Sequence, residues 1–196
     1  DPIPSRGLGD VYKRQRVAAR YISASSNMTM TEVRTNKALA AKRYHPVSEN
    51  IQFKDSTGKG MDWVESVVKY ERPDVVILDM GDKFADIRSE RTDITLKAAA
   101  IHARNIAKQY ECAVIWMSQL SAEAEGRADL NQAMMEGSKT GKAAEADLMI
   151  LIGKTQQAEG EEEDPVRYLN IAKNKLNGYQ GKITCVLDGS RSVYSA

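Results

Sequence analysis

The pattern of apolar and polar positions divides the chain into short buried strands and amphipathic helices. Three runs of consecutive apolar residues are short and lack the alternation of a half-exposed strand, which predicts strands buried on both faces, as in a parallel sheet. Further along, the segment NGYQG lies between two more predicted strands and predicts a hairpin turn. The five predicted strands are Val75–Asp79, Ala113–Met117, Leu148–Ile152, Arg167–Ala172 and Lys182–Leu187.

Apolar residues at helical spacing predict three helices. Met61–Tyr70 and Asp93–Tyr110 each carry an apolar stripe, as expected of helices that cover a sheet. A third helix is expected from about Thr29 to Arg43. Its predicted end follows from His45 and Pro46, because the residue before a proline avoids helical backbone angles.

The order of these elements indicates the fold class. Strands alternate with helices and are followed by a hairpin, which predicts an α/β domain with a mostly parallel sheet flanked by helices and a C-terminal β-hairpin. Val17–Ser23 and Ile51–Phe53 predict two short additional strands. Residues 1–15 show no helical or strand period and resemble translated adapter or vector sequence. We therefore expect a non-native lead over residues 1–15 and one partial domain over residues 16–196.

Composition narrows the class of protein. The chain is 42% hydrophobic and 28% charged, and none of its apolar runs approaches the ~18 residues of a membrane span, so no membrane partner is expected. A net charge of +1 excludes a uniformly basic nucleic-acid binder but leaves room for a local basic loop. Cys112 and Cys185 both lie in apolar runs, which is typical of buried thiols in a reducing cytoplasm.

Polar residues follow two of the buried strands at the point where each strand ends. The first strand ends in Asp79, and a carboxylate at the carboxyl edge of a parallel sheet is suited to hold Mg²⁺ beside a nucleotide, or else to cap a turn. Asp82 fits a supporting acid or a plain cap. Ser118 and Gln119 follow the next strand, where a neutral amide can bind a terminal phosphate or simply face solvent.

Two basic segments come later in the chain. The loop EGSKTGKAAEADL is not a phosphate-binding loop, because only three residues separate its glycines and no hydroxyl follows its last lysine. Its Lys139 and Lys142 suit contacts with a nucleic-acid backbone instead, or are solvated charges. Lys173 and Lys175 lie on one face of the strand before the hairpin turn. They either reach a phosphate or protect an exposed sheet edge.

Taken in this order, the four motifs resemble the RecA-like helicase domain of the DnaB family, closest to the helicase half of the short-tailed phage helicase-primases. The resemblance covers about residues 17–194. It implies an ATP-dependent replicative DNA helicase that assembles as a ring, expected to be a hexamer, uses ATP and Mg²⁺, and moves on single-stranded DNA in the cytoplasm of a phage host or bacterium. By itself, the chain is not expected to hydrolyse ATP.

The resemblance also assigns catalytic roles to individual residues. It implies that Asp79 binds the metal and that Gln119 senses the γ-phosphate. The pair of Lys173 and Lys175 is expected to act on the nucleotide of a neighbouring subunit, as an arginine finger does.

Binding roles follow from the same resemblance. Nucleotide binding is expected to involve the acids Asp79 and Asp82 together with Ser118. DNA binding is expected to involve a set of three basic residues, which are Arg127, Lys139 and Lys142.

Three features depart from the family pattern. No phosphate-binding loop precedes Val17, the segment SASSNM lacks the expected catalytic glutamate, and the finger position holds Lys175, which cannot form the two parallel hydrogen bonds of an arginine. Two alternatives therefore stay open. One is a recombinase or regulatory ATPase built on the same core, and the other is a non-enzymatic α/β interaction domain that has lost nucleotide binding.

Overall fold

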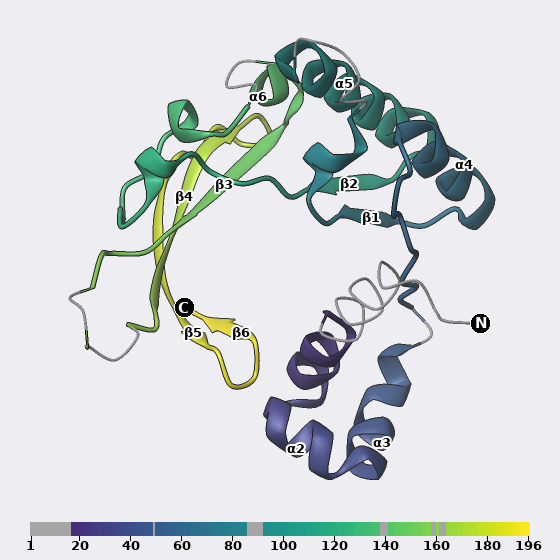
Figure 1. The fold of residues 1–196 in the computed structure, drawn as a ribbon, viewed down its shortest axis with the longest axis vertical. Helices are drawn as coiled ribbons and strands as arrows, with labels where there is room; N and C mark the ends of the chain where they lie inside the picture. The colour runs from purple at the N-terminus through teal and green to yellow at the C-terminus, as the bar shows by residue number, and fades with distance from the viewer. Residues whose placement is uncertain (1–16, 49, 86–91, 138–140, 158–159, 161–163) are drawn as a thin grey trace, which may run out of the picture. The chain divides into compact units, whose positions relative to one another are not determined.

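The computed structural model describes residues 17–48, 50–85, 92–137, 141–157, 160 and 164–196. It divides into two compact units, residues 58–184 and residues 1–57 with 185–196, and each is described by itself (Figure 1). The predicted boundary after residue 15 lies outside the described residues and stays a prediction. Among the described helices, none is both long enough and apolar enough to cross a membrane.

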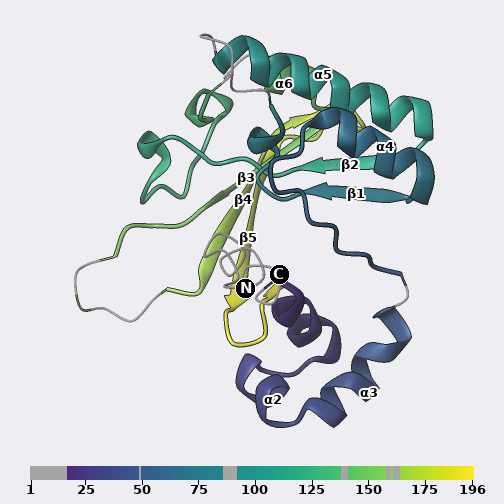
Figure 2. The same ribbon diagram turned by 45° about the vertical axis from the view of Figure 1, so that its right-hand side comes forward.

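The larger unit contains a parallel pair of strands covered by two helices. β1 and β2 pair in parallel with Leu78 opposite Trp116, and helices α4 and α5 lie along one face of this pair (Figures 1 and 2). Two of the predicted helices and two of the predicted strands are thereby confirmed. The bounds are α4 Met61–Glu71, β1 Val75–Leu78, η1 Gly81–Phe84, α5 Thr92–Tyr110 and β2 Ala113–Trp116.

The core of this layer lies between the helices and one side of the strands. Val68 on α4 and Ile106 on α5 are each only 1% exposed, and the apolar stripes of both helices meet the inward-facing residues of the strands. The buried members of the cluster include Val64, Val68, Leu78, Phe84, Leu96, Ala103 and Ile106.

The prediction that β1 and β2 are buried on both faces is wrong for the described structure. Exposure alternates along both strands, and Ile77 on β1 and Ile115 on β2 are 62% and 49% exposed. The physical reason is that α4 and α5 pack on one face only, so every second side chain points away from them. The sheet therefore presents a continuous apolar face formed by Val75, Ile77, Ile115 and Met117.

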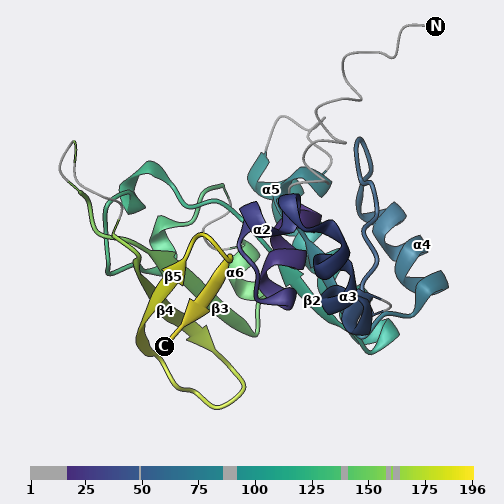
Figure 3. The ribbon, with the colours of Figure 1, turned by 90° about the horizontal axis from the view of Figure 1, so that it is seen from below.

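An antiparallel sheet with strand order β3-β4-β5-β6 follows along the chain. β3 and β4 lie side by side in Figures 1 and 3, and the predicted hairpin connects β4 to β5. The α/β class is confirmed, although the only parallel pair among the described strands is β1 with β2. The bounds are β3 Leu148–Gly153, β4 Val166–Asn174, β5 Gly181–Asp188 and β6 Val193–Ser195.

The chain between β2 and β3 packs over the antiparallel sheet as short helical turns. Leu130, Met134 and Met135 form a second apolar cluster with Met149 and Leu151 of β3. On β4, a buried asparagine ties the same segment down, since the side-chain amide of Asn170 donates to the carbonyl of Ala128 at 2.9 Å. The turns are η2 Ala122–Ala124, η3 Gln132–Met134 and α6 Gly141–Glu145.

The smaller unit corrects three predictions. Residues 17–26 are helical rather than a strand, because the strong helix formers in AARY outweigh the β-branched residues beside them. The predicted third helix is two helices, α2 Met30–Thr35 and α3 Lys37–Ser48. α3 continues past Pro46, which lies in the last turn and removes only one hydrogen bond there. Residues 51–53 form no strand, because the described structure gives them no partner strand.

The start of α2 matches its sequence signal. The backbone N–H of Glu32 donates to the Thr29 hydroxyl at 3.2 Å, and the Thr29 N–H donates to the Glu32 carboxylate at 2.7 Å. This reciprocal pair is a capping box, which satisfies two N–H groups that have no partner within the helix.

A polar tie joins α4 to α5. Glu65 on α4 bonds to His102 Nε2 at 2.7 Å and accepts a hydrogen bond from the Tyr110 hydroxyl at 3.1 Å. The hydrogen bonds from His102 and then Tyr110 hold the pKa of Glu65 below its usual value of 4.5. Burial, followed by the neighbouring Glu65, raises the pKa of Tyr110.

We expect Glu65→Gln to lower stability near neutral pH and to lose this effect in acid. A carboxyl group whose pKa is lowered by folding stabilises the protein above its unfolded pKa, and that stability disappears as the pH falls through the folded pKa. The measurement is the free energy of unfolding of wild type and variant between pH 7 and pH 3. Asp62→Asn is the matched control, because Asp62 is fully exposed and 3.8 Å from His102 Nδ1. A pH-independent difference for Glu65→Gln would contradict this expectation.

Candidate functional site

The carboxyl ends of β1 and β2 are held together by backbone hydrogen bonds beyond the strands themselves. The N–H of Met117 donates to the carbonyl of Leu78 at 3.1 Å, and the N–H of Gly81 donates to the carbonyl of Met117 at 2.8 Å. These two bonds fix the segments that follow both strands. Asp79 and Gln119 are therefore at the same edge of the parallel pair, and both are exposed.

The turn after β1 is tightly packed. Met80 adopts a left-handed backbone conformation with φ of 56°, which turns the chain sharply into η1. Gly81 then lies against the ring of Trp116, where a Cβ atom would come within 2.5 Å of the ring carbons. Because a real side chain cannot approach so closely, glycine is required here if Trp116 is to keep its place.

Asp82 is the centre of a compact polar cluster at this edge. Its carboxylate accepts hydrogen bonds from the Trp116 indole at 3.0 Å and from the Ser118 hydroxyl at 2.6 Å. The ammonium of Lys142 lies 3.0 and 2.9 Å from its two oxygens and 2.7 Å from the Ser118 hydroxyl. The cluster thus joins η1, the end of β2 and α6.

The side chain of Lys142 is only 4% exposed, and that of Asp82 is 25% exposed. An ammonium removed from water needs a carboxylate and enough hydrogen-bond acceptors to be tolerated. Here its three contacts go to the two Asp82 oxygens and the Ser118 hydroxyl. The cluster is therefore internally satisfied and fixes the three segments relative to each other.

The structure brings several of the predicted site residues together. Asp82 and Ser118, predicted to lie near the nucleotide, are in contact. Lys142, predicted to bind DNA, joins them instead of facing solvent. Trp116 is a member that the sequence did not reveal, since an aromatic residue at the end of a strand looks like ordinary core.

The other two residues predicted to bind DNA are not part of this cluster as described. Lys139 lies outside the described residues. Arg127 lies just after the turn that follows η2 and is exposed. The DNA-binding role of both therefore stays a prediction.

The hairpin lysines lie against α6. The ammonium of Lys173 donates to the carbonyls of Ala143 and Ala144, and that of Lys175 to the carbonyl of Ala144 at 3.3 Å. Lys175 also pairs with Asp147 at 3.5 Å. Burial, followed by repulsion from Lys175, lowers the pKa of Lys173. Both lysines therefore contact α6 of the same chain in this structure.

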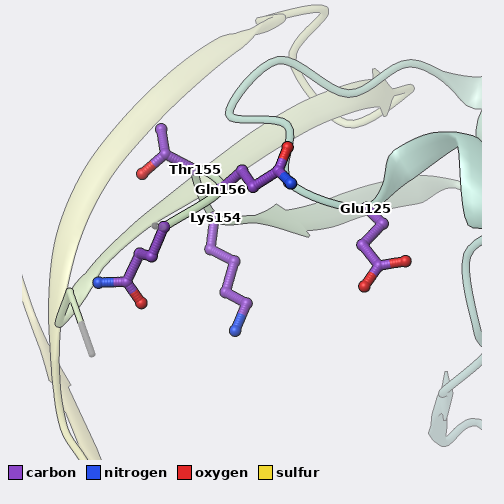
Figure 4. Close-up of a pocket in the computed structure, with 6 residues that line it drawn as sticks. Glu125, Lys154, Thr155 and Gln156 are labelled. Carbon is purple, nitrogen blue, oxygen red and sulfur yellow. The ribbon is translucent and has the colours of Figure 1, made fainter. Parts of the chain in front are cut away.

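A polar pocket of about 500 Å³ lies at the far end of β3. Figure 4 shows Lys154, Thr155 and Gln156 on one side of it and Glu125 on the other. None of the predicted site residues is among those that line it, which are Glu125, Gly126, Lys154, Thr155, Gln156 and Gln157. The sheet edge and this pocket are thus separate features.

The donor chemistry at the sheet edge fits a magnesium ion bound with phosphate. Within the part of the chain that the structure describes, no three histidine, cysteine, aspartate or glutamate side chains gather as a metal site. Mg²⁺ does not need such a group, because it is commonly held by one or two carboxylates together with phosphate oxygens and water. The exposed Asp79 is the carboxylate available for that purpose, whereas Asp82 is occupied by Lys142.

We expect Lys142→Met to destabilise the larger unit by about 3–5 kcal/mol, because it leaves the Asp82 carboxylate without its buried partner. Adding Asp82→Asn should recover part of the loss, since the buried charge is then removed. Denaturant unfolding of the two single variants and the double variant measures this coupling. Lys182→Met is the matched control, because Lys182 pairs with the exposed Asp129 and should cost about 1 kcal/mol or less. Strictly additive losses would contradict the pairing.

Comparison with known proteins identifies the fold. No protein-family model and no curated protein matches the chain. Among solved structures, the chain is similar to a DnaB-like replicative helicase that was described with its interactions with primase, at 16% identity and a TM-score of 0.75. It is also similar to a second solved structure, described as an ATPase domain, at 16% identity and a TM-score of 0.78.

These similarities cover most of this chain and a smaller part of the matched ones. The first match covers 90% of this chain and 47% of the helicase, so the chain spans about half its length. The second covers 92% of this chain and 70% of the solved ATPase domain. The chain therefore has a RecA-like fold, which it shares with part of a DnaB-like replicative helicase and with a solved ATPase domain.

Proposed function

We propose that this chain is part of the ATPase domain of an ATP-dependent replicative DNA helicase of the phage type, which works as a homo-oligomeric ring, expected to be a hexamer, in the cytoplasm. The observation that carries the proposal is the sheet edge, where Asp79 and Gln119 follow two parallel strands that are paired in register. Ligands of open α/β sheets bind at this edge. The shared fold with helicase ATPase domains supports the same interpretation.

In this proposal the two exposed residues have different tasks. Asp79 binds the Mg²⁺ that accompanies ATP, and the metal supplies neutralisation of the phosphate charge. Gln119 donates a hydrogen bond to the terminal phosphate and so distinguishes ATP from ADP. Asp82 and Ser118 do not touch the nucleotide directly, because the cluster with Lys142 already engages their polar atoms. They hold the two neighbouring segments in place.

The lysine pair and the DNA contacts complete the proposal. Lys173 and Lys175 reach the nucleotide of a neighbouring subunit in the ring, after leaving the carbonyls of α6. Single-stranded DNA is bound by Lys139 and Arg127 through its phosphates. A DNA contact by Lys142 would require its ammonium to leave Asp82, so the proposal does not depend on it.

The nucleotide site is tested by Asp79→Asn. We expect the variant to weaken the Mg²⁺-dependent binding of a fluorescent ATP analogue by about tenfold or more, because a charged contact contributes about 1.5–3 kcal/mol. Asp74→Asn is a matched control, since Asp74 is an exposed aspartate just before the same strand, at its opposite end. Fluorescence titration with and without Mg²⁺ measures the affinities. Equal affinities for wild type and both variants would favour the non-enzymatic interaction domain instead.

The DNA surface is tested by Arg127→Ala combined with Lys139→Ala. We expect weaker binding of single-stranded DNA and a salt dependence that is flatter by about 0.7 in the logarithmic slope for each lost phosphate contact. Base preference should be unchanged, because phosphate contacts carry no sequence information. Titrations at several salt concentrations provide the slopes, with Lys182→Ala as control. An unchanged slope in the double variant would remove these residues from the interface.

A further inference from the structure

The short helix α6 is held by charged groups at both of its ends. Near its start, the ammonium of Lys142 donates to Asp82 and to the Ser118 hydroxyl. At its other end, three successive carbonyls accept hydrogen bonds from cationic side chains of other elements. The carbonyls are those of Ala143, Ala144 and Glu145, and the donors are Lys173, Lys175 and Arg104.

The position of the three cationic side chains at this end of α6 has a clear physical reason. The last carbonyls of a helix have no partner within the helix and carry a partial negative charge, which attracts ammonium and guanidinium groups. Arg104 on α5 donates to the Glu145 carbonyl at 2.7 Å. The two lysines repel each other, so their shared position against α6 depends on these carbonyls and on Asp147.

The middle of α6 is short and closely packed. Ala143, which follows Lys142 directly, is 0% exposed and belongs to the second apolar cluster. Gly137 packs close to Lys142, since a Cβ atom built on this glycine would lie 3.9 Å from the ammonium. A displacement of the α6 carbonyls therefore displaces the backbone that carries Lys142, because five residues form little more than one turn.

We propose that Lys142 is a positioning residue that couples the hairpin lysines to the sheet edge. A change in the contacts of Lys173 and Lys175 with α6 alters, through Lys142, the arrangement of Asp82 and Ser118 beside Gln119. When the two lysines leave the α6 carbonyls for a phosphate, α6 loses part of its cap, and the bonds from Lys142 to Asp82 and Ser118 loosen. The consequence for nucleotide binding rests on the proposed function. The coupling between the hairpin and the sheet edge does not depend on nucleotide binding, because it involves only contacts within this chain.

Trp116 provides a direct readout of this coupling. Its indole N–H donates to Asp82 at 3.0 Å, so the ¹⁵N–¹H resonance of the indole reports whether the carboxylate is held in place. The chain has two tryptophans, and Trp63 on α4 serves as an internal reference. Trp116→Phe assigns the two signals.

The experiment compares the Trp116 indole resonance in wild type and in the double variant Lys173→Met with Lys175→Met. We expect an upfield shift of this resonance, in the direction produced by Lys142→Met, while the reference signal stays unchanged. Lys182→Met is the control on the neighbouring strand and should shift neither signal. Conservative replacement of both hairpin lysines by arginine should restore the wild-type position, because arginine can also donate to the carbonyls.

Two outcomes would overturn the proposal. One is an unmoved Trp116 signal in the folded hairpin double variant. The other is a shift of the same size when the hairpin variant is made in the Lys142→Met background, since the effect would then bypass Lys142. If Lys142→Met does not fold, the comparison of wild type with the hairpin double variant and the arginine rescue still test the proposal. The experiment uses no nucleotide, so a failure of nucleotide binding leaves this result unaffected.

Discussion

The buried ion pair between Lys142 and Asp82 is the interaction on which the sheet edge depends. A buried ammonium without a carboxylate partner is strongly destabilising, so the turn after β1 and the start of α6 must meet. The Ser118 hydroxyl and the Trp116 indole also donate hydrogen bonds to the same carboxylate. One interaction thereby fixes the surroundings of the strand ends, whereas the proposed nucleotide ligands that follow them remain exposed.

Local sequence patterns were sufficient for most of the elements in the larger unit. The helices α4 and α5 were predictable because their apolar stripes pack on a single surface, and the strands because apolar runs were bounded by turn residues. The hairpin between β4 and β5 followed from NGYQG. Asp79 and Gln119 could be placed at one sheet edge because consecutive parallel strands end on the same side.

Other features depend on contacts between distant parts of the chain and could not be predicted. Lys142 and Asp82 are 60 residues apart in sequence, and nothing near Lys142 distinguishes a buried lysine from one in an exposed loop. The sequence pattern of β4 likewise does not show that the side chains of Lys173 and Lys175 contact α6. The strand prediction within residues 17–26 was wrong for a different reason, since alanine and arginine favour a helix when no strand pairs with the segment.

The alternating exposure of β1 and β2 has a consequence for the behaviour of this chain in solution. A contiguous face of valine, isoleucine and methionine side chains attracts other apolar surfaces, and among the described strands both members of this sheet are edge strands, which pair readily with other chains. Self-association through this face would bury it and raise the apparent thermal stability as the protein concentration increases. Melting temperatures of variants are therefore comparable only when they are measured at matched protein concentration.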